Sequence, residues 1–258
     1  MPAHAQALCL IPARMGSTRL PGKPLADQTG KPLIQHVIEN ARRATAVSRV
    51  AVATDDARIA EAVRAFGGEA VITRTDHPNG TSRLAEAVTL LDAGDELILN
   101  VQGDEPEIDP AIIDALVRGL AADPDADMAT LYAPFADDED PTNPNLVKVV
   151  KNQHDHALYF SRSPIPFDRS LPDQSKIENR KSKILKHPGL YAYRRAFLLQ
   201  YPNLEPTPLE QAEQLEQLRV LEHGHTIKLI PAPGPVQPGI DTPEQYAAFV
   251  VRAKSQNR

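Results

Sequence analysis

Residues 8–25 read LCLIPARMGSTRLPGKPL, in which an apolar run passes directly into a loop rich in glycine and cationic side chains. The run Leu8–Ala13 is short and uncharged, which is typical of a buried strand. Residues 32–44 then carry apolar side chains at helical spacing, and residues 49–54 form a second apolar run. Strands that alternate with helices of about a dozen residues indicate βαβ units. We therefore expect an α/β fold with a mostly parallel, Rossmann-like sheet and helices on both faces.

The alternation continues to about residue 122 and returns near the end of the chain. We expect further helices at 56–66, 82–92, 208–223 and 243–253, and further strands at 69–73, 96–101 and 227–231. Between these regions, strand-like runs at 128–133, 146–151, 157–161 and 190–194 are separated by long loops. The sequence thus predicts an α/β core formed by residues 1–122 and 226–258, with a smaller mixed insertion at 123–225.

The composition excludes several classes of protein. The 258 residues carry a net charge of -6, which argues against bulk binding to nucleic acid. No stretch approaches the ~20 apolar residues of a membrane span, and the N-terminus lacks the pattern of a secretory signal. The single cysteine, Cys9, cannot form an internal disulfide, which fits a reducing compartment. We expect a cytoplasmic protein without nucleic acid or a membrane as partner.

The loop after the first strand has the composition of a polyphosphate site. Open α/β sheets bind ligands at the carboxyl ends of their strands, where this loop begins. Arg14, Arg19 and Lys23 supply charge, Ser17 adds a donor, and Gly16 lets the backbone approach a ligand closely. The loop is not a Walker A motif, because five residues rather than four separate its glycines and a proline follows the lysine. No G-x-G-x-x-G follows the strand either, which counts against a dinucleotide site.

Two aspartates in glycine-bearing turns are candidate ligands for Mg²⁺. Asp104 lies in NVQGDEP (100–106), directly after a strand at the same sheet edge, and Asp241 lies in GIDTPE (239–244). Mg²⁺ prefers one or two carboxylates together with phosphate oxygens. Taken singly, the first motif could be only a turn and Asp241 could be a helix N-cap. That the carboxylates of Asp104 and Asp241 lie together in the folded protein is a hypothesis.

A series of motifs resembles the 3-deoxy-manno-octulosonate cytidylyltransferases, also called CMP-KDO synthetases, within the sugar nucleotidyltransferases. The series runs in order over nearly the whole chain. It comprises IPARMGSTRLPGKPL (11–25), DHPNGTSRLAEA (76–87), NVQGDEP (100–106), NPNLVKVV (143–150), YFSRSPIPFDR (159–169), KHPGLYAYRR (186–195), PLEQAEQLEQLRVLEHG (208–224) and GIDTPE (239–244).

The resemblance implies a nucleotide-diphospho-sugar transferase fold and a reaction in which CTP and 3-deoxy-D-manno-octulosonate (KDO) give CMP-KDO and diphosphate. It implies Mg²⁺ on Asp104 and Asp241, with Lys23 and Arg14 as the other catalytic groups. The implied nucleotide site comprises Ala13, Arg14, Ser17, Arg19, Lys23, Arg74, Gly80 and Thr81. The implied sugar site comprises Gln102, Arg162, His187, Tyr191, Glu216 and Gln217. A homodimer formed through the insertion, and a product used for lipopolysaccharide in a Gram-negative bacterium, are further implications.

The chain departs from the family pattern at Met15-Gly16, where an aromatic residue and alanine are usual, and at Ser82, where an acidic residue is common. Three alternatives remain open. They are a cytidylyltransferase for another sugar acid, such as N-acetylneuraminate or an amino-KDO analogue, a non-catalytic nucleotide-binding protein, and a dehydrogenase.

Overall fold

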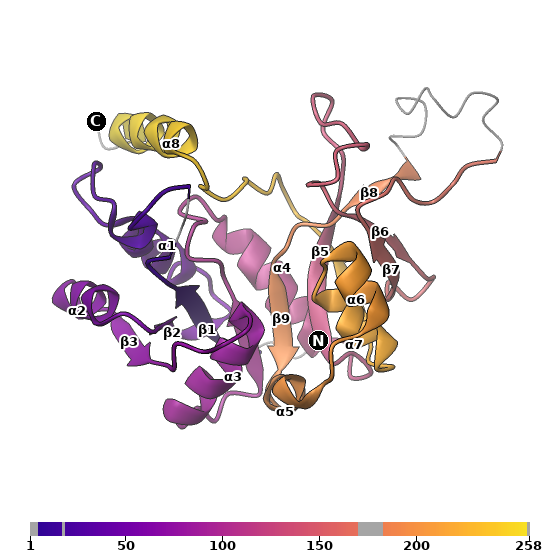
Figure 1. Cartoon of the computed structure of the whole chain (residues 1–258), viewed down its shortest axis with the longest axis horizontal. Coiled ribbons are helices and arrows are strands. Elements are labelled where there is room, and N and C mark those ends of the chain that lie inside the picture. Colours follow the sequence, from indigo (N-terminus) through magenta and orange to yellow (C-terminus); the bar gives the residue numbers. More distant parts are fainter. Residues whose placement is uncertain (1–4, 17–18, 170–182, 257–258) are drawn as a thin grey trace.

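A computed structural model describes residues 5–16, 19–169 and 183–256 of the chain. Its sheet has the order β3-β2-β1-β4-β9-β5-β8-β6-β7, with β10 also paired to β5 (Figure 1). The strands are β1 (Ala7–Ala13), β2 (Val47–Thr54), β3 (Glu69–Ile72), β4 (Leu97–Asn100), β5 (Met128–Pro134), β6 (Lys148–Lys151), β7 (Ala157–Ser161), β8 (Leu185–Lys186), β9 (Tyr191–Arg194) and β10 (Ile227–Pro231).

The connections between strands are mostly helical. The helices are α1 (Leu33–Ala41), α2 (Ala57–Ala65), α3 (Gly80–Leu90), α4 (Pro110–Ala121), α5 (Arg195–Gln200), α6 (Pro208–Glu213), α7 (Gln217–Glu222) and α8 (Pro243–Gln256). Short 3-10 turns are η1 (Lys23–Leu25) and η3 (Tyr201–Asn203). No helix in these described ranges is long and apolar enough to cross a membrane.

The central strands are parallel, as the alternation of strands and helices predicts. β1 pairs in parallel with β2 and β4, β2 pairs in parallel with β3, and β10 pairs in parallel with β5. β9 runs antiparallel between β4 and β5. The predicted α/β class with a mostly parallel sheet is confirmed.

Side chains of β1 alternate between two apolar cores, one on each face of the sheet. Cys9 and Ile11 belong to the core that contains α1 and α4, whereas Leu8 and Leu10 belong to the core that contains α3. All four are fully buried. Burying such a leucine or isoleucine contributes roughly 1.5–3 kcal/mol, so β1 anchors both cores of the sheet.

The predicted helix 208–223 is wrong in one respect, because α6 and α7 are separate helices. Gln214 has a left-handed backbone (φ 53°) and ends α6. Arg162 donates to the carbonyls of Glu213 (2.7 Å) and Gln214 (3.2 Å). In a continuous helix these carbonyls would accept from amides four residues later. The Arg162 side chain, directly after β7, therefore replaces two helical bonds, and the apolar periodicity does not reveal it. Helix α4 was not among the predicted elements.

The predicted insertion is only partly separate from the core. β5 and β9 lie within residues 123–225, yet they pair with each other and, through β4 and β10, with the central sheet. β6, β7 and β8 form the part that extends from the sheet at the end opposite β3 (Figure 1). We call β6–β8 and the described residues 162–169 the arm. The division into domains itself stays a prediction.

A buried lysine fixes the base of the arm. Lys148 is fully buried, and its ammonium donates to the carbonyls of Asn143 (3.1 Å), Leu146 (2.8 Å) and Arg162. Burial lowers the pKa of Lys148. These three carbonyls would lose a charged donor if the ammonium were removed.

We expect Lys148→Met to lower the free energy of unfolding by about 2–4 kcal/mol, because three part-buried carbonyls lose a charged donor. Urea denaturation measures this change. The matched control is Lys151→Met on the same strand, whose ammonium pairs with the part-exposed Asp155 and should contribute less than about 1 kcal/mol. Equal losses in the two variants would contradict the structural role of Lys148.

Candidate active site

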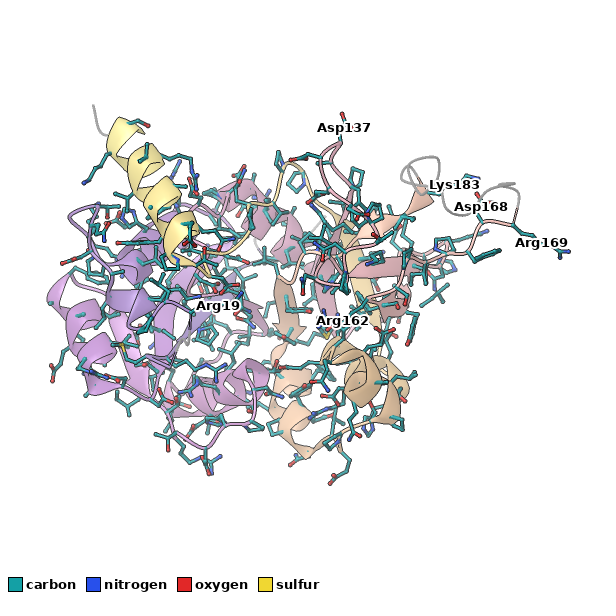
Figure 2. All side chains as sticks on the ribbon, turned by 45° about the horizontal axis from the view of Figure 1, so that its top comes forward. Arg19, Asp137, Arg162, Asp168, Arg169 and Lys183 are labelled. Atoms are coloured by element: carbon teal, nitrogen blue, oxygen red, sulfur yellow. The ribbon has the colours of Figure 1, made fainter. Side chains whose placement is uncertain are left out.

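A cavity of about 310 Å³ lies at the carboxyl ends of β1 and β4. The loop after β1, the turn after β4 and the segment before α8 form its walls, and Figure 2 shows Arg19 near the start of α8. Its lining residues are Pro12, Ala13, Arg14, Gly16, Arg19, Lys23, Pro24, Gln102, Gly103, Asp104 and Asp241. We call it the phosphate half of the cleft, since it gathers the cations of the loop at the edge where such sheets bind ligands.

The two candidate aspartates converge on one ammonium group. Lys23 Nζ lies 2.7 Å from Asp104 Oδ2 and 3.2 Å from Asp241 Oδ1. Arg19 lies 3.1 Å from the other oxygen of Asp241. The side chain of Lys23 is only 12% exposed, so this ammonium is held inside the cavity wall. The structure thus brings together two carboxylates that the sequence could only suggest as a pair.

Backbone contacts between the two turns explain why they meet. The Ile240 amide donates to the carbonyl of Asp104 (2.8 Å), and a Cβ on Gly239 would lie 3.2 Å from Asp104 Oδ1. Glycine at 239 therefore permits the close approach. Gln245 from α8 accepts from the amide of Asp241 (2.8 Å), which leaves the Asp241 carboxylate directed at the cations rather than at the helix as a cap.

The donor set fits a small divalent cation. Two carboxylates face one cationic position, which the Lys23 ammonium now takes, and phosphate oxygens of a bound nucleotide could complete the coordination. Within the described residues no cluster of three or more His, Cys, Asp or Glu could hold a metal ion by protein ligands alone.

A second cavity of about 390 Å³ continues the first one. Both cavities are lined by Pro12, Ala13, Arg14 and Gln102. The rest of the second wall consists of His77, Asn79, Gly80, Thr81, Arg83, Asn100, Tyr191, Gln214, Leu215, Glu216 and Gln217. We call this second cavity the acceptor half of the cleft. The two halves make one continuous cleft with a cationic end and a largely neutral, polar end.

Polar groups in the acceptor half are mutually oriented by hydrogen bonds. Thr81 Oγ1 donates to Glu216 Oε2 (3.1 Å), and the Tyr191 hydroxyl donates to Gln217 Oε1 (3.3 Å). The protein around the cavity raises the pKa of Glu216, chiefly through burial. Burial also raises the pKa of Tyr191, so its hydroxyl stays a donor. This arrangement suits a ligand with several hydroxyl groups.

Most of the predicted site residues line the cleft, but three do not. Arg74 is 68% exposed and lies 3.6 Å from Glu86 and from Asp76. The Arg162 guanidinium, labelled in Figure 2, donates to the carbonyls of Glu213 and Gln214 at the α6–α7 turn and to the carbonyl of Pro144. His187 is buried against Thr130. The cavity lining does not support direct ligand contacts for Arg74, Arg162 and His187, and such contacts stay predictions. Ser17, also predicted, lies outside the described residues.

Other residues line the cleft without having been predicted. Asn79 caps α3 by accepting from the Ser82 amide (2.9 Å), and Arg83 is held by Asp55 (2.8 Å) and Thr73 (2.7 Å). Asn100 ends β4 at the ligand-binding edge. Its place after an apolar strand is a signal that could have identified it. The signal for Asn79, a helix-capping residue before glycine, is too general.

The fold and the cleft define an α/β nucleotidyltransferase: a mostly parallel sheet whose carboxyl edge holds a cationic loop beside paired carboxylates. Residues 8–227 match the family model described as cytidylyltransferase.

Relatives with the same name cover nearly the whole chain. The 3-deoxy-manno-octulosonate cytidylyltransferase of Halorhodospira halophila is 48% identical over 95% of this chain and 96% of its own length. That of Syntrophobacter fumaroxidans is 50% identical over 93% and 94%. A solved CMP:2-keto-3-deoxy-manno-octonic acid synthetase, complexed with CTP, superposes with a TM-score of 0.88 at 44% identity, covering 97% of this chain and 99% of the other. The chain belongs to the family of 3-deoxy-manno-octulosonate cytidylyltransferases.

The burial of His187 has a measurable consequence. Burial lowers the pKa of His187 to about 3, and its Nε2 lies 2.9 Å from Thr130 Oγ1. The unfolded chain, with a histidine pKa of about 6.5, binds a proton in the intervening pH range that the folded chain does not. The contribution of His187 to the stability of the protein therefore falls as the pH falls from 6.5 toward 3.

We expect the wild type to lose about 2 kcal/mol more than His187→Asn between pH 7.5 and pH 5, because the variant lacks this group. Denaturant unfolding at the two pH values measures the difference. His154→Asn, at an exposed histidine, is the control and should behave as the wild type. Identical pH slopes for wild type and His187→Asn would refute the neutral, buried state.

Proposed function

We propose that this protein transfers the cytidylyl group of CTP to 3-deoxy-D-manno-octulosonate and releases diphosphate. The observation that carries the proposal is the continuous cleft, in which a cationic half with paired carboxylates opens into a polar half. Its near relatives carry the name of this activity, and one of them is solved with CTP.

The phosphate half has the groups that a triphosphate requires. Arg14 lies on the boundary between the two halves and has no ion pair with any residue in the described ranges. Lys23 and Arg19 pair with Asp241, and a triphosphate would compete for both cations. We assign Arg14, Arg19 and Lys23 to the phosphate oxygens, with Lys23 nearest the phosphorus that reacts.

Asp104 and Asp241 would hold Mg²⁺ together with the nucleotide. The ion would supply Lewis-acid charge stabilisation at the phosphate oxygens. Lys23, which pairs with both carboxylates, would be available to the phosphates if a metal ion balanced the charge of Asp104 and Asp241. In this account the protein's own work is to place cations and carboxylates before the substrates arrive.

The acceptor half would bind the sugar acid through Gln102, Tyr191, Glu216 and Gln217. Its neutral hydroxyl and amide groups match a polyhydroxylated ligand, and Gln102 belongs to both halves of the cleft. The anomeric hydroxyl then attacks the α-phosphorus of CTP in line. One P–O bond forms, the bond to diphosphate breaks, and the proton of the hydroxyl passes to solvent water. Positioning and charge stabilisation account for the catalysis, as in phosphoryl transfer generally.

Measurement of diphosphate release tests the proposal. We expect turnover with CTP and KDO, and much slower release with UTP or ATP, or with N-acetylneuraminate or an amino-KDO analogue. Faster turnover with another sugar acid would show that this acid, rather than KDO, is the substrate. Binding of CTP without release of diphosphate would instead indicate a non-catalytic protein.

We expect Asp104→Asn to reduce kcat by roughly a hundredfold or more and to raise the Mg²⁺ concentration needed for half-maximal rate, because several kcal/mol of charge stabilisation is lost. The stabilisation of the CTP-bound protein by Mg²⁺ in thermal melts is a second readout. The control is Asp109→Asn, which changes an aspartate at the start of α4 to another good N-cap. Full turnover by Asp104→Asn would contradict the assignment of Asp104 as a Mg²⁺ ligand.

We also propose a cytoplasmic homodimer whose product serves lipopolysaccharide assembly. The arm carries two exposed apolar side chains, Leu158 (59% exposed) and Phe167 (70% exposed), which a second copy could cover.

We expect Leu158→Glu to weaken the dimer by at least tenfold, because it places a charge in the apolar contact. Light scattering over a dilution series measures the change. An unchanged mass at every concentration would contradict this interface.

A further inference from the structure

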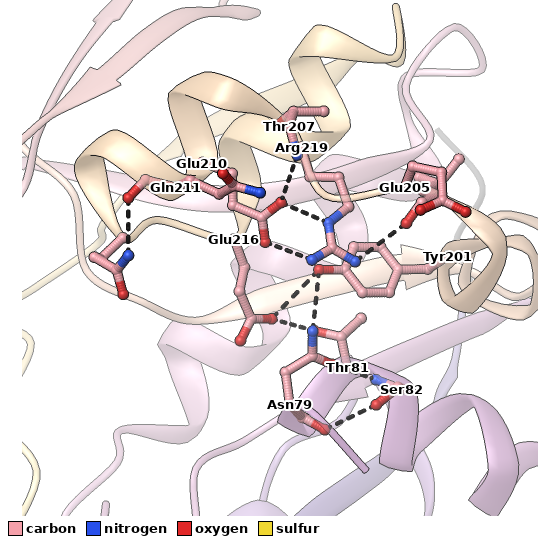
Figure 3. A network of polar contacts seen from close by, with 12 residues as sticks. Asn79, Thr81, Ser82, Tyr201, Glu205, Thr207, Glu210, Gln211, Glu216 and Arg219 are labelled. Atoms are coloured by element: carbon pink, nitrogen blue, oxygen red, sulfur yellow. Dashed lines mark hydrogen bonds and ion pairs between the residues drawn. The ribbon is translucent and has the colours of Figure 1, made fainter.

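The wall of the acceptor half joins two segments that are distant in sequence. Asn79 and Thr81 come from the start of α3, and Glu216 comes from the turn before α7. Tyr201 in η3 lies between them (Figure 3). Its hydroxyl donates to Glu216 Oε2 (3.5 Å) and accepts from Asn79 Nδ2 (3.5 Å), beside the shorter bond from Thr81 to the same carboxylate.

The ring of Tyr201 cannot move freely. It is 2% exposed, its edge meets the ring of Phe197, and the Arg219 guanidinium lies 5.2 Å from its centroid. Arg219 is itself held by both carboxylate oxygens of Glu210, at 2.7 and 2.6 Å (Figure 3). Glu210 also takes part in the capping box of α6 with Thr207. The position of the hydroxyl is thus determined by packing on several sides.

The Glu216 carboxylate, in contrast, depends on hydroxyl groups for its orientation. It makes no ion pair with any residue that the structure describes, and it faces the open cavity. Burial raises the pKa of Tyr201, which keeps its hydroxyl protonated and available as a donor. Tyr201 does not line the cavity, so it can affect a ligand there only through its neighbours.

We propose that Tyr201 is a positioning residue that holds the Glu216 carboxylate against the start of α3 and so couples the nucleotide side of the cleft to the sugar side. The inference rests on the proposed function. A nucleotide that contacts Gly80 and Thr81 would fix the partners of Glu216, and Glu216 would then be set for the sugar hydroxyls. Removing the Tyr201 hydroxyl should weaken sugar binding and leave nucleotide binding intact.

The test is Tyr201→Phe in the full chain, because phenylalanine keeps the ring that contacts Phe197 and Arg219. We expect the KM for KDO at saturating CTP to rise about five- to tenfold, as loss of one hydrogen bond to a charged group allows. We expect kcat to stay within about threefold, and the Kd for CTP alone, measured by calorimetry, to stay within about twofold. Tyr132→Phe is the control, since its ring packs with Lys151 outside the cleft.

A KM for KDO within twofold of wild type would overturn the proposal, as would an equal loss of CTP affinity.

A double-mutant cycle is an independent test. In the Glu216→Gln background, Tyr201→Phe should change the KM for KDO less than twofold, whereas full additivity would show that Tyr201 does not act through Glu216. Failure of the proposed function can be told apart from failure of the Tyr201 proposal, because the wild type would then release no diphosphate from CTP and KDO. If the wild type is inactive, calorimetric titration of KDO into the CTP-bound wild type and variants still tests whether Tyr201 affects sugar binding.

Discussion

The site depends on one electrostatic arrangement, the ammonium of Lys23 between the carboxylates of Asp104 and Asp241. Two carboxylates that face the same point repel each other unless a cation separates them. A pair of unit charges 4 Å apart interacts by about 4 kcal/mol at an effective dielectric constant of 20, and partial exposure of both aspartates reduces that value. The lysine therefore makes it possible for the turns at 104 and 239–241 to pack together. The same cation is available to a triphosphate once another positive charge balances the carboxylates.

The sheet and the phosphate half could be predicted well from the sequence because both follow from local rules. The apolar run of β1, the glycines of its loop and the position of Asp104 after β4 all point to one edge of a parallel sheet. That Asp241 reaches the same point depends on a backbone bond between Ile240 and Asp104, which links turns far apart in the chain. No local pattern contains that contact. The sequence could offer the pair only as a hypothesis.

The acceptor half was less predictable because tertiary contacts override the pattern there. The apolar periodicity of residues 208–223 is that of one helix, yet Arg162 takes the carbonyls that would continue it. As a result Gln214 adopts a left-handed backbone and the chain from Gln214 to Gln217 lines the cleft. Arg162, which the sequence predicts as a ligand contact, shapes the turn that lines the cleft. His187 is a similar case, since its imidazole is buried against Thr130 and Phe160 beneath the wall rather than on it.

The two halves of the cleft differ in how their geometry is maintained, and this difference bears on the order of events in catalysis. The phosphate half is built on strands with two buried faces, and its charges are already paired. The acceptor half combines the start of α3 and residues of β4 and β9 with one wall, Gln214–Gln217, at the turn between the short helices α6 and α7. This acceptor wall is tied to α3 through hydroxyl and amide groups of Thr81, Asn79 and Tyr201. Bonds of this kind contribute about 1 kcal/mol each, so the acceptor wall is the part that ligands can reorganise. A bound nucleotide that fixes the start of α3 would restrict the freedom of that wall before the sugar arrives. Binding of the nucleotide before the sugar is therefore the order that this construction favours.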